Sequence, residues 1–227
     1  MDPTPKEVAA GHAFYTRRSL AVYDLAILGY FSRLAWRCPA SRIVDHYNRH
    51  VSANHLDVGV GTGYFLDHCR FPPSPEPPRV ALMDLSTNCL DVASKRVARL
   101  EPELIEADVL QPIAYDGPRF DSVGLNYVLH CLPGDISSKA VALDHVIALA
   151  TPGAWVFGAT LLHDGVDRNW FARKVMDRNN CHRIFSNADD SLDGLRSAMS
   201  DRLSGSSVEV VGCVGIFAGR VHETRTN

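Results

Sequence analysis

The sequence predicts an α/β protein built on a doubly wound, mostly parallel sheet. Along the middle of the chain, short apolar segments alternate with segments of helical periodicity. The first apolar segment, His55 to Val58, leads into three glycines at alternate positions, Gly59, Gly61 and Gly63, and then into a helical pattern. Strand, glycine turn and helix in this order bring bare backbone close to a ligand at the carboxyl end of a parallel strand.

The composition fits one domain with a sizeable core. The chain has 227 residues, of which 46% are hydrophobic and 22% are charged. We expect a single domain over 1–227, with a helical lid or flank over 1–52, a ligand-binding core over 53–162, further helices over 163–205 and a terminal strand pair over 206–222. The net charge is −3 and no long Lys/Arg run occurs, which disfavours a nucleic-acid partner.

The cysteines and histidines point to neither a disulfide framework nor a metal site. The six cysteines are widely spread without a C-x-x-C pair, and the ten histidines include no H-E-x-x-H or other tight ligand spacing. Reduced thiols are typical of a cytoplasmic protein. The chain opens with a polar, acidic segment, and no apolar run is long enough to span a bilayer. We therefore expect a cytoplasmic protein without a bound metal.

Helical spacing of apolar residues predicts helices over residues 5–50, before the first strand. The pair Cys38–Pro39 interrupts the pattern, and Ser41 is placed to cap a further helix over 42–51. The proline-rich segment 71–78 is expected to form a stiff connector at the surface.

Each of the next two predicted strands ends in an acid. The strand over 79–86 ends in Asp84, about 20 residues after the glycine loop, where a carboxylate can accept hydrogen bonds from both hydroxyls of a ribose. The alternative is that Asp84 caps the next helix, but Ser86 already occupies the cap position before a helix over 88–100. The strand over 103–110 ends in Asp108, for which a plain turn role is the alternative.

The second half of the chain continues the alternation. A strand begins at Phe120 and is followed by the polar candidates Asn126, Tyr127 and His130. Further elements are expected as a helix over 138–150, a buried strand over 154–162, a helix within 163–183, a last helix from 186 to about 203 and two strands over 208–221.

The glycine loop and its preceding acid, Asp57, resemble motif I of the class I S-adenosylmethionine-dependent methyltransferases, whose pattern is acid-x-Gly-x-Gly-x-Gly. A carboxylate beside the loop suits a cationic ligand better than a phosphate. The segment Tyr23-Asp24, Ser32 and Trp36-Arg37 resembles the stretch before motif I in the ubiquinone/menaquinone-type small-molecule methyltransferases. The resemblance covers about residues 20–162 well and the final strands loosely.

This resemblance implies a seven-stranded, Rossmann-like sheet with an antiparallel last strand. It implies S-adenosyl-L-methionine as cofactor and S-adenosyl-L-homocysteine as product. In this chain the cofactor-binding positions would be Tyr23, Asp57, Gly59, Gly61, Gly63, Asp84, Leu85, Asp108, Val109 and Asn126.

The implied reaction is direct displacement of the methyl group onto a small, partly apolar metabolite, with oxygen favoured as acceptor atom and nitrogen, carbon or sulfur as alternatives. His130 is the candidate proton acceptor, since an unperturbed imidazole titrates near neutral pH. Its alternative is a buried structural histidine. The expected acceptor pocket contains Tyr127, His163, Asn169, Trp170 and Met176. A monomer or a homodimer is expected.

Two other functions compete with this one. A nicotinamide-dependent oxidoreductase would share the sheet, but Tyr64 stands where a dinucleotide loop needs its third glycine, and Asp57 is unfavourable beside a pyrophosphate. A cofactor-binding protein that transfers no methyl group is the third hypothesis, because no base is certain from the sequence.

Overall fold

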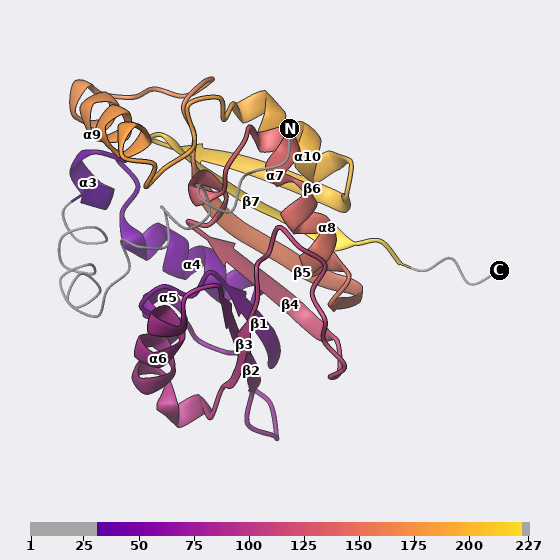
Figure 1. Ribbon diagram of the computed structural model, residues 1–227. Helices are drawn as coiled ribbons and strands as arrows, with labels where there is room; N and C mark the ends of the chain where they lie inside the picture. Colours follow the sequence, from indigo (N-terminus) through magenta and orange to yellow (C-terminus); the bar gives the residue numbers. More distant parts are fainter. Residues whose placement is uncertain (1–30, 224–227) are drawn as a thin grey trace.

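The computed structural model describes residues 31–223, which build an α/β fold around one seven-stranded sheet (Figure 1). The strand order is β3-β2-β1-β4-β5-β7-β6. Strands β1 to β5 pair in parallel, whereas β7 is antiparallel to both β5 and β6. This confirms the predicted mostly parallel sheet with an antiparallel last strand. The strands are β1 Asn54–Val58, β2 Arg79–Asp84, β3 Glu103–Glu106, β4 Phe120–Asn126, β5 Ala150–Leu161, β6 Leu203–Val211 and β7 Val214–Val221.

Helices cover both faces of the sheet. The described helices are α3 Ser32–Leu34, α4 Ala40–His50, α5 Tyr64–His68, α6 Thr87–Arg96, η2 Ala98–Leu100, η3 Leu129–Cys131, α7 Ile136–Lys139, α8 Val141–Ile147, α9 Trp170–Cys181 and α10 Leu192–Ser200. In Figure 1, α4, α5 and α6 lie on one side of the sheet, and α7, α8 and α10 lie on the other.

Each face has its own hydrophobic core, because successive strand residues point to opposite sides. Along β2, Ala81 and Met83 pack into the cluster that includes α7, α8 and α10. Their neighbours Val80 and Leu82 pack into the cluster that includes α4, α5, α6 and α9. Burial on both faces explains why these strands read as unbroken apolar runs in the sequence.

Two helix N-caps were predicted from the sequence, and the structure confirms one of them. The Ser86 side chain accepts a hydrogen bond from the Cys89 N–H and caps α6, as predicted. The predicted cap at Ser41 is wrong, because α4 already begins at Ala40 and Pro39 occupies the N-cap position without a side-chain hydrogen bond.

Three predicted segments differ from the structure. The helix expected over 138–150 is two short helices, α7 and α8, and β5 already begins at Ala150 because Gly153, at φ +78°, lets the strand continue past the Pro-Gly step. The helix expected from residue 186 begins at Leu192, where Ser191 caps it. Strand β6 begins at Leu203 and not at 208. Residues 204–207 lack an apolar pattern and lie in a strand at the sheet edge, so the sequence did not indicate this start.

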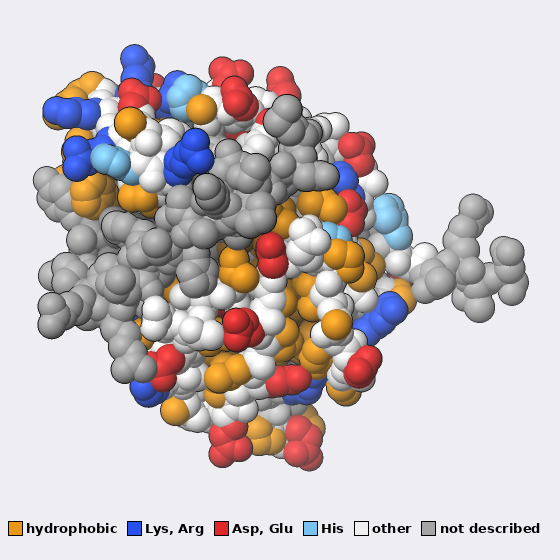
Figure 2. Space-filling model, viewed as in Figure 1, with side chains coloured by type: hydrophobic (Ala, Val, Ile, Leu, Met, Phe, Trp, Pro, Cys, Tyr) orange, Lys and Arg blue, Asp and Glu red, His pale blue; other side chains and the backbone are white. Residues whose placement is uncertain are grey.

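Three further features concern the length of the helices, the charge of the surface and the state of the cysteines. Within 31–223, no helix is both long enough and apolar enough to cross a membrane. Basic side chains gather over α9 in Figure 2, and the exposed residues of this helix include Arg173, Lys174 and Arg178. All six cysteines carry free thiols.

Candidate functional site

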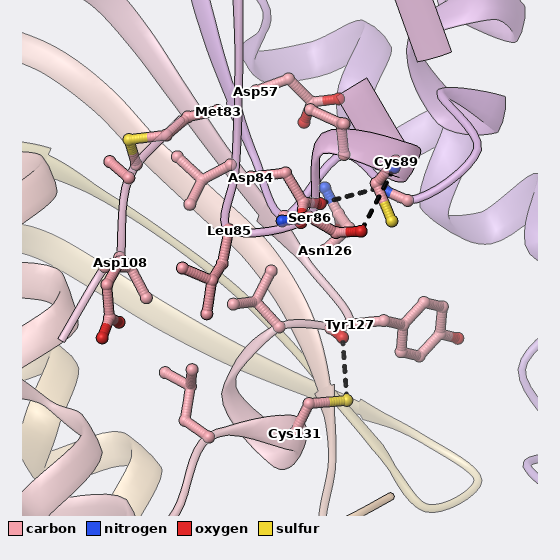
Figure 3. A pocket seen from close by; sticks show the side chains of 18 of the residues that line it. Asp57, Met83, Asp84, Leu85, Ser86, Cys89, Asp108, Asn126, Tyr127 and Cys131 are labelled. Carbon is pink, nitrogen blue, oxygen red and sulfur yellow. Dashed lines mark hydrogen bonds between the residues drawn. The ribbon is translucent and has the colours of Figure 1, made fainter. Parts of the chain in front are cut away.

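A pocket lies where the chain leaves β1, β2 and β4 (Figure 3). In the order β3-β2-β1-β4-β5, successive connections turn in opposite directions on either side of β1, and open α/β sheets bind ligands in the crevice at this position. The lining consists of Asp57, Val58, Gly59, Val60, Gly61, Thr62, Tyr64, Phe65, Met83, Asp84, Leu85, Ser86, Cys89, Ala107, Asp108, Val109, Leu110, Asn126, Tyr127, Val128, Cys131, Leu132 and Pro133.

The glycine loop between β1 and α5 needs glycine at all three positions. Gly59, Gly61 and Gly63 have φ values of +64°, +52° and +72°, which disfavour any residue with a side chain. A Cβ at Gly59 would also overlap Val128, and one at Gly63 would lie 3.2 Å from Ala93 on α6. A Cβ at Gly61 would meet nothing within 4 Å, so the Gly61 backbone is bared towards the pocket.

Asp84 joins the glycine loop to the end of β2. Its Oδ2 accepts a hydrogen bond from the Gly61 N–H at 3.3 Å, and its Oδ1 accepts one from the Ser86 N–H at 2.8 Å. The Gly59 N–H bonds to the Met83 carbonyl at 2.7 Å. The loop after β1 and the loop after β2 are therefore held together at the pocket.

Asp57 is buried at the end of β1 and lines the same pocket. Its Oδ1 accepts a hydrogen bond from the Tyr47 hydroxyl of α4. Burial raises the pKa of the Asp57 carboxyl to about 7, with a further rise from Asp84, while the Tyr47 hydrogen bond opposes them. Asp57 is therefore poised between its neutral and anionic forms near neutral pH.

Asn126, the last residue of β4, presents an orphaned amide to the pocket. The residue is 7% exposed, and neither its Oδ1 nor its Nδ2 has a hydrogen-bond partner. Burial and the Asp57 carboxyl raise the pKa of the neighbouring Tyr47 hydroxyl, and the Asn126 amide opposes this rise without making a hydrogen bond to it. Buried polar groups without partners cost free energy, so a polar ligand in this pocket would satisfy Asn126.

Asp108 closes the pocket beyond β3. Its Oδ1 accepts a hydrogen bond from the Leu110 N–H at 2.9 Å. Apolar side chains of Met83, Leu85 and Val109 line the same pocket. Asp57, Asp84 and Asp108 thus surround one pocket, as labelled in Figure 3.

Tyr127 leaves β4 in the left-handed region, with φ at 60°, and also lines the pocket. Positive φ is rare for a bulky residue and is found most often at functional sites. Its ring lies 5.9 Å from that of Phe65 and 5.8 Å from that of His130.

His130 is not among the residues that line the pocket. It is 3% exposed, and its Nδ1 lies 3.5 Å from both the Thr160 hydroxyl and the Leu161 N–H. Burial, followed by the charge of Lys139, lowers the pKa of His130 to about 3. This environment favours the structural alternative over the general base expected from the sequence.

The structure does not bring the other expected acceptor residues to this pocket. Asn169 caps α9 by accepting from the Ala172 N–H at 2.7 Å and donates to the Leu34 carbonyl at 2.8 Å. Trp170 is 75% exposed, Met176 lies in the core and His163 is half-buried. Tyr23 lies outside the described residues.

Sequence reasoning missed several residues at the site. Met83 and Ser86 lie within two residues of Asp84 in the chain. Including the sequence neighbours of this predicted site residue would have found them. Cys89 follows on the first turn of α6, and Cys131 follows β4 at η3. Tyr47 carried no local signal, because it meets Asp57 only through the packing of α4 on the sheet.

Glycine-bared backbone, three carboxyls and an orphaned amide therefore meet in one pocket at the switch point of an α/β sheet. A family model described as a methyltransferase domain matches residues 31–195. The chain therefore belongs to this methyltransferase family, and it has the fold of the class I S-adenosylmethionine-dependent methyltransferases.

Individual proteins agree with this assignment. Demethylluteothin O-methyltransferase of Streptomyces thioluteus is 38% identical over 212 residues, which cover 93% of this chain and 91% of the relative. The physcion biosynthesis cluster O-methyltransferase of Aspergillus chevalieri is 33% identical over 216 residues, covering 94% and 95%. The crystal structure of the N-methyltransferase NodS from Bradyrhizobium japonicum WM9, in complex with S-adenosyl-L-homocysteine, has the same fold, with a TM-score of 0.61, 15% identity and coverage of 92% of this chain and 100% of NodS.

Proposed function

We propose that this protein transfers the methyl group of S-adenosyl-L-methionine to an oxygen atom of a small, partly apolar molecule. The observation that carries the proposal is the convergence of the glycine loop, Asp57, Asp84, Asp108 and the orphaned Asn126 amide on one pocket. A cationic nucleoside with hydroxyl and amino groups has the donors that these acceptors need.

The residues present fit such a cofactor. Asp84 would accept from ribose hydroxyls beside the bared backbone of Gly61, and Asp108 with the Val109 N–H would hold the adenine edge. Asp57 and Asn126 would face the charged methionine end. When bound, the cofactor supplies a methyl carbon that is already electrophilic through its sulfonium. The protein has to hold the acceptor oxygen in line and exclude water.

The apolar part of the pocket lining supports a partly apolar substrate. It includes the rings of Phe65 and Tyr127 and the side chains of Leu132 and Pro133. The names of the two relatives described above support oxygen as the acceptor atom. Because His130 lies outside the lining and burial lowers its pKa to about 3, we assign it a structural role and not that of a general base.

The setting of the reaction follows from composition and topology. Six free thiols support a reducing, cytoplasmic location, and the net charge of −3 supports a small-molecule substrate over nucleic acid. One sheet runs from Asn54 to Val221, which supports a single functional domain.

Incubation with methyl-labelled S-adenosyl-L-methionine and a panel of phenols, enols, carboxylic acids and amines tests this function. We expect S-adenosyl-L-homocysteine release together with a labelled methyl ether or ester. Labelled amines would reject the oxygen assignment. Stabilisation by NADH and none by S-adenosyl-L-homocysteine in a thermal-shift assay would reject methyl transfer altogether.

A further inference from the structure

Tyr47 does not line the pocket, but it is hydrogen-bonded to Asp57, which does. It lies on α4 and is fully buried. Its ring meets Phe157 edge-on at 5.0 Å and stacks with Phe65 at 6.3 Å between ring centroids. These contacts fix the ring, and the hydroxyl donates its hydrogen bond to Oδ1 of Asp57.

The absence of a side chain at Gly124 on β4 makes this approach possible. A Cβ there would lie 3.0 Å from the Tyr47 hydroxyl oxygen and 3.3 Å from Asp57 Oδ1, closer than most real contacts. The pair is therefore built from three elements, namely α4, β1 and β4. The hydrogen bond from Tyr47 therefore fixes the orientation of the Asp57 carboxyl at the pocket wall.

The groups around Asp57 differ in how they affect its charge. Burial and the Asp84 carboxylate on β2 disfavour the anion. The Cys69 thiol after α5 stays neutral, because burial and the nearby Asp57 carboxyl raise its pKa to about 12. His55, on the same strand, is buried and neutral because burial lowers its pKa to about 3. Tyr47 on α4 is the neighbour that favours the anion, since its hydroxyl donates to the charged form.

We propose that Tyr47 is a positioning residue whose hydroxyl orients Asp57 and favours its anionic form, so that the carboxylate can receive the ammonium group of the cofactor. This inference rests on the proposed function and deepens it, because it assigns control of cofactor affinity to a residue behind the pocket wall.

Calorimetric titrations of the full chain with two ligands test the inference. S-adenosyl-L-homocysteine carries the ammonium group, and 5′-methylthioadenosine keeps the adenosine but lacks the amino acid. Both are titrated from about pH 6 to about pH 9 into the wild type, Tyr47→Phe and the matched control Tyr115→Phe. The Tyr115 hydroxyl contacts Arg79 and Glu103 away from the pocket.

We expect wild-type affinity for S-adenosyl-L-homocysteine to rise with pH, because Asp57 loses its proton. In Tyr47→Phe the pKa of Asp57 rises further, so the profile moves to higher pH and affinity near pH 7 falls roughly fivefold to tenfold. The deficit narrows at high pH. Binding of 5′-methylthioadenosine stays unchanged, and Tyr115→Phe behaves as the wild type.

Two outcomes for Tyr47→Phe would overturn the inference. One is an unchanged affinity and pH profile for S-adenosyl-L-homocysteine, and the other is an equal loss of both ligands, which a purely structural role would produce. If Tyr47→Phe does not fold, Asp57→Asn replaces it, and retention of the wild-type pH profile in that variant would overturn the inference. Failure of the wild type to bind either ligand would instead reject the proposed function, and the inference with it.

Discussion

The backbone N–H of Gly61 donates a hydrogen bond to the carboxylate of Asp84, with 3.3 Å between nitrogen and Oδ2. This contact ties the loop after β1 to the end of the neighbouring strand β2. Two features that lie far apart in the sequence, a glycine pattern and an acid, thus form one rigid edge of the pocket. Loss of either residue should affect the other.

Replacing Asp84 with alanine should weaken binding of S-adenosyl-L-homocysteine by roughly 2–3 kcal/mol, because charged hydrogen bonds to the ligand are lost and the loop is released. Isothermal titration calorimetry measures the change. Asp193→Ala is the matched control, since this acid is 95% exposed on α10. An Asp84→Ala dissociation constant equal to the wild-type value would contradict the ribose role.

Replacing Gly61 with alanine should separate backbone strain from blockage of the pocket. A positive φ costs alanine roughly 1–2 kcal/mol of stability, while the added methyl group meets no protein atom and projects into the ligand space. Gly205→Ala is the control, because Gly205 also has a positive φ, at +58°, and open space around its Cβ position, yet lies on β6. Both variants should lose similar stability in denaturant titrations, and Gly61→Ala alone should lose cofactor affinity.

Replacing His130 with alanine should mainly destabilise the fold. The ring is buried, packs edge-on against Phe185 at 4.8 Å and is held neutral by its surroundings. We expect a loss of roughly 2–3 kcal/mol in unfolding free energy, with turnover per folded molecule preserved. A large fall in kcat at unchanged stability and cofactor affinity would restore the general-base role.

Replacing only one partner of the buried ion pair between Lys139 and Asp190 should strongly lower the unfolding free energy. Both side chains have no exposed surface, the Nζ–Oδ2 distance is 2.7 Å, and the Lys139 ammonium also donates to the Ser186 carbonyl. Lys139→Met leaves an uncompensated carboxyl and should cost roughly 3–5 kcal/mol. The double variant Lys139→Met with Asp190→Leu should recover most of this loss in chemical denaturation. Additive losses in the double variant would show that the two groups do not compensate each other.

Local patterns were enough to predict the sheet and one side of the site. Asp84 and Asn126 end β2 and β4, and the glycine loop and Asp108 follow β1 and β3, so their meeting at one crevice follows from strand order. The cap at Ser86 is equally local.

The remaining features depend on how separate elements pack. The partnership of Tyr47 with Asp57 needs the docking of α4 on the sheet, which no sequence pattern encodes. The residues of α9 have a composition that suits an acceptor site. In the folded protein, however, Met176 packs into the core and Trp170 is exposed to solvent. His130 follows its strand closely enough to suggest catalysis, yet η3 turns it away from the pocket.

The central claim is that one pocket, ringed by the glycine loop and three carboxyls, binds the methyl-donating nucleoside. Calorimetric titration of the wild-type protein with S-adenosyl-L-homocysteine tests it most directly, with NADH titrated in parallel. We predict saturable heat with S-adenosyl-L-homocysteine and none with NADH. No heat with S-adenosyl-L-homocysteine, or saturable binding of NADH instead, would contradict the claim.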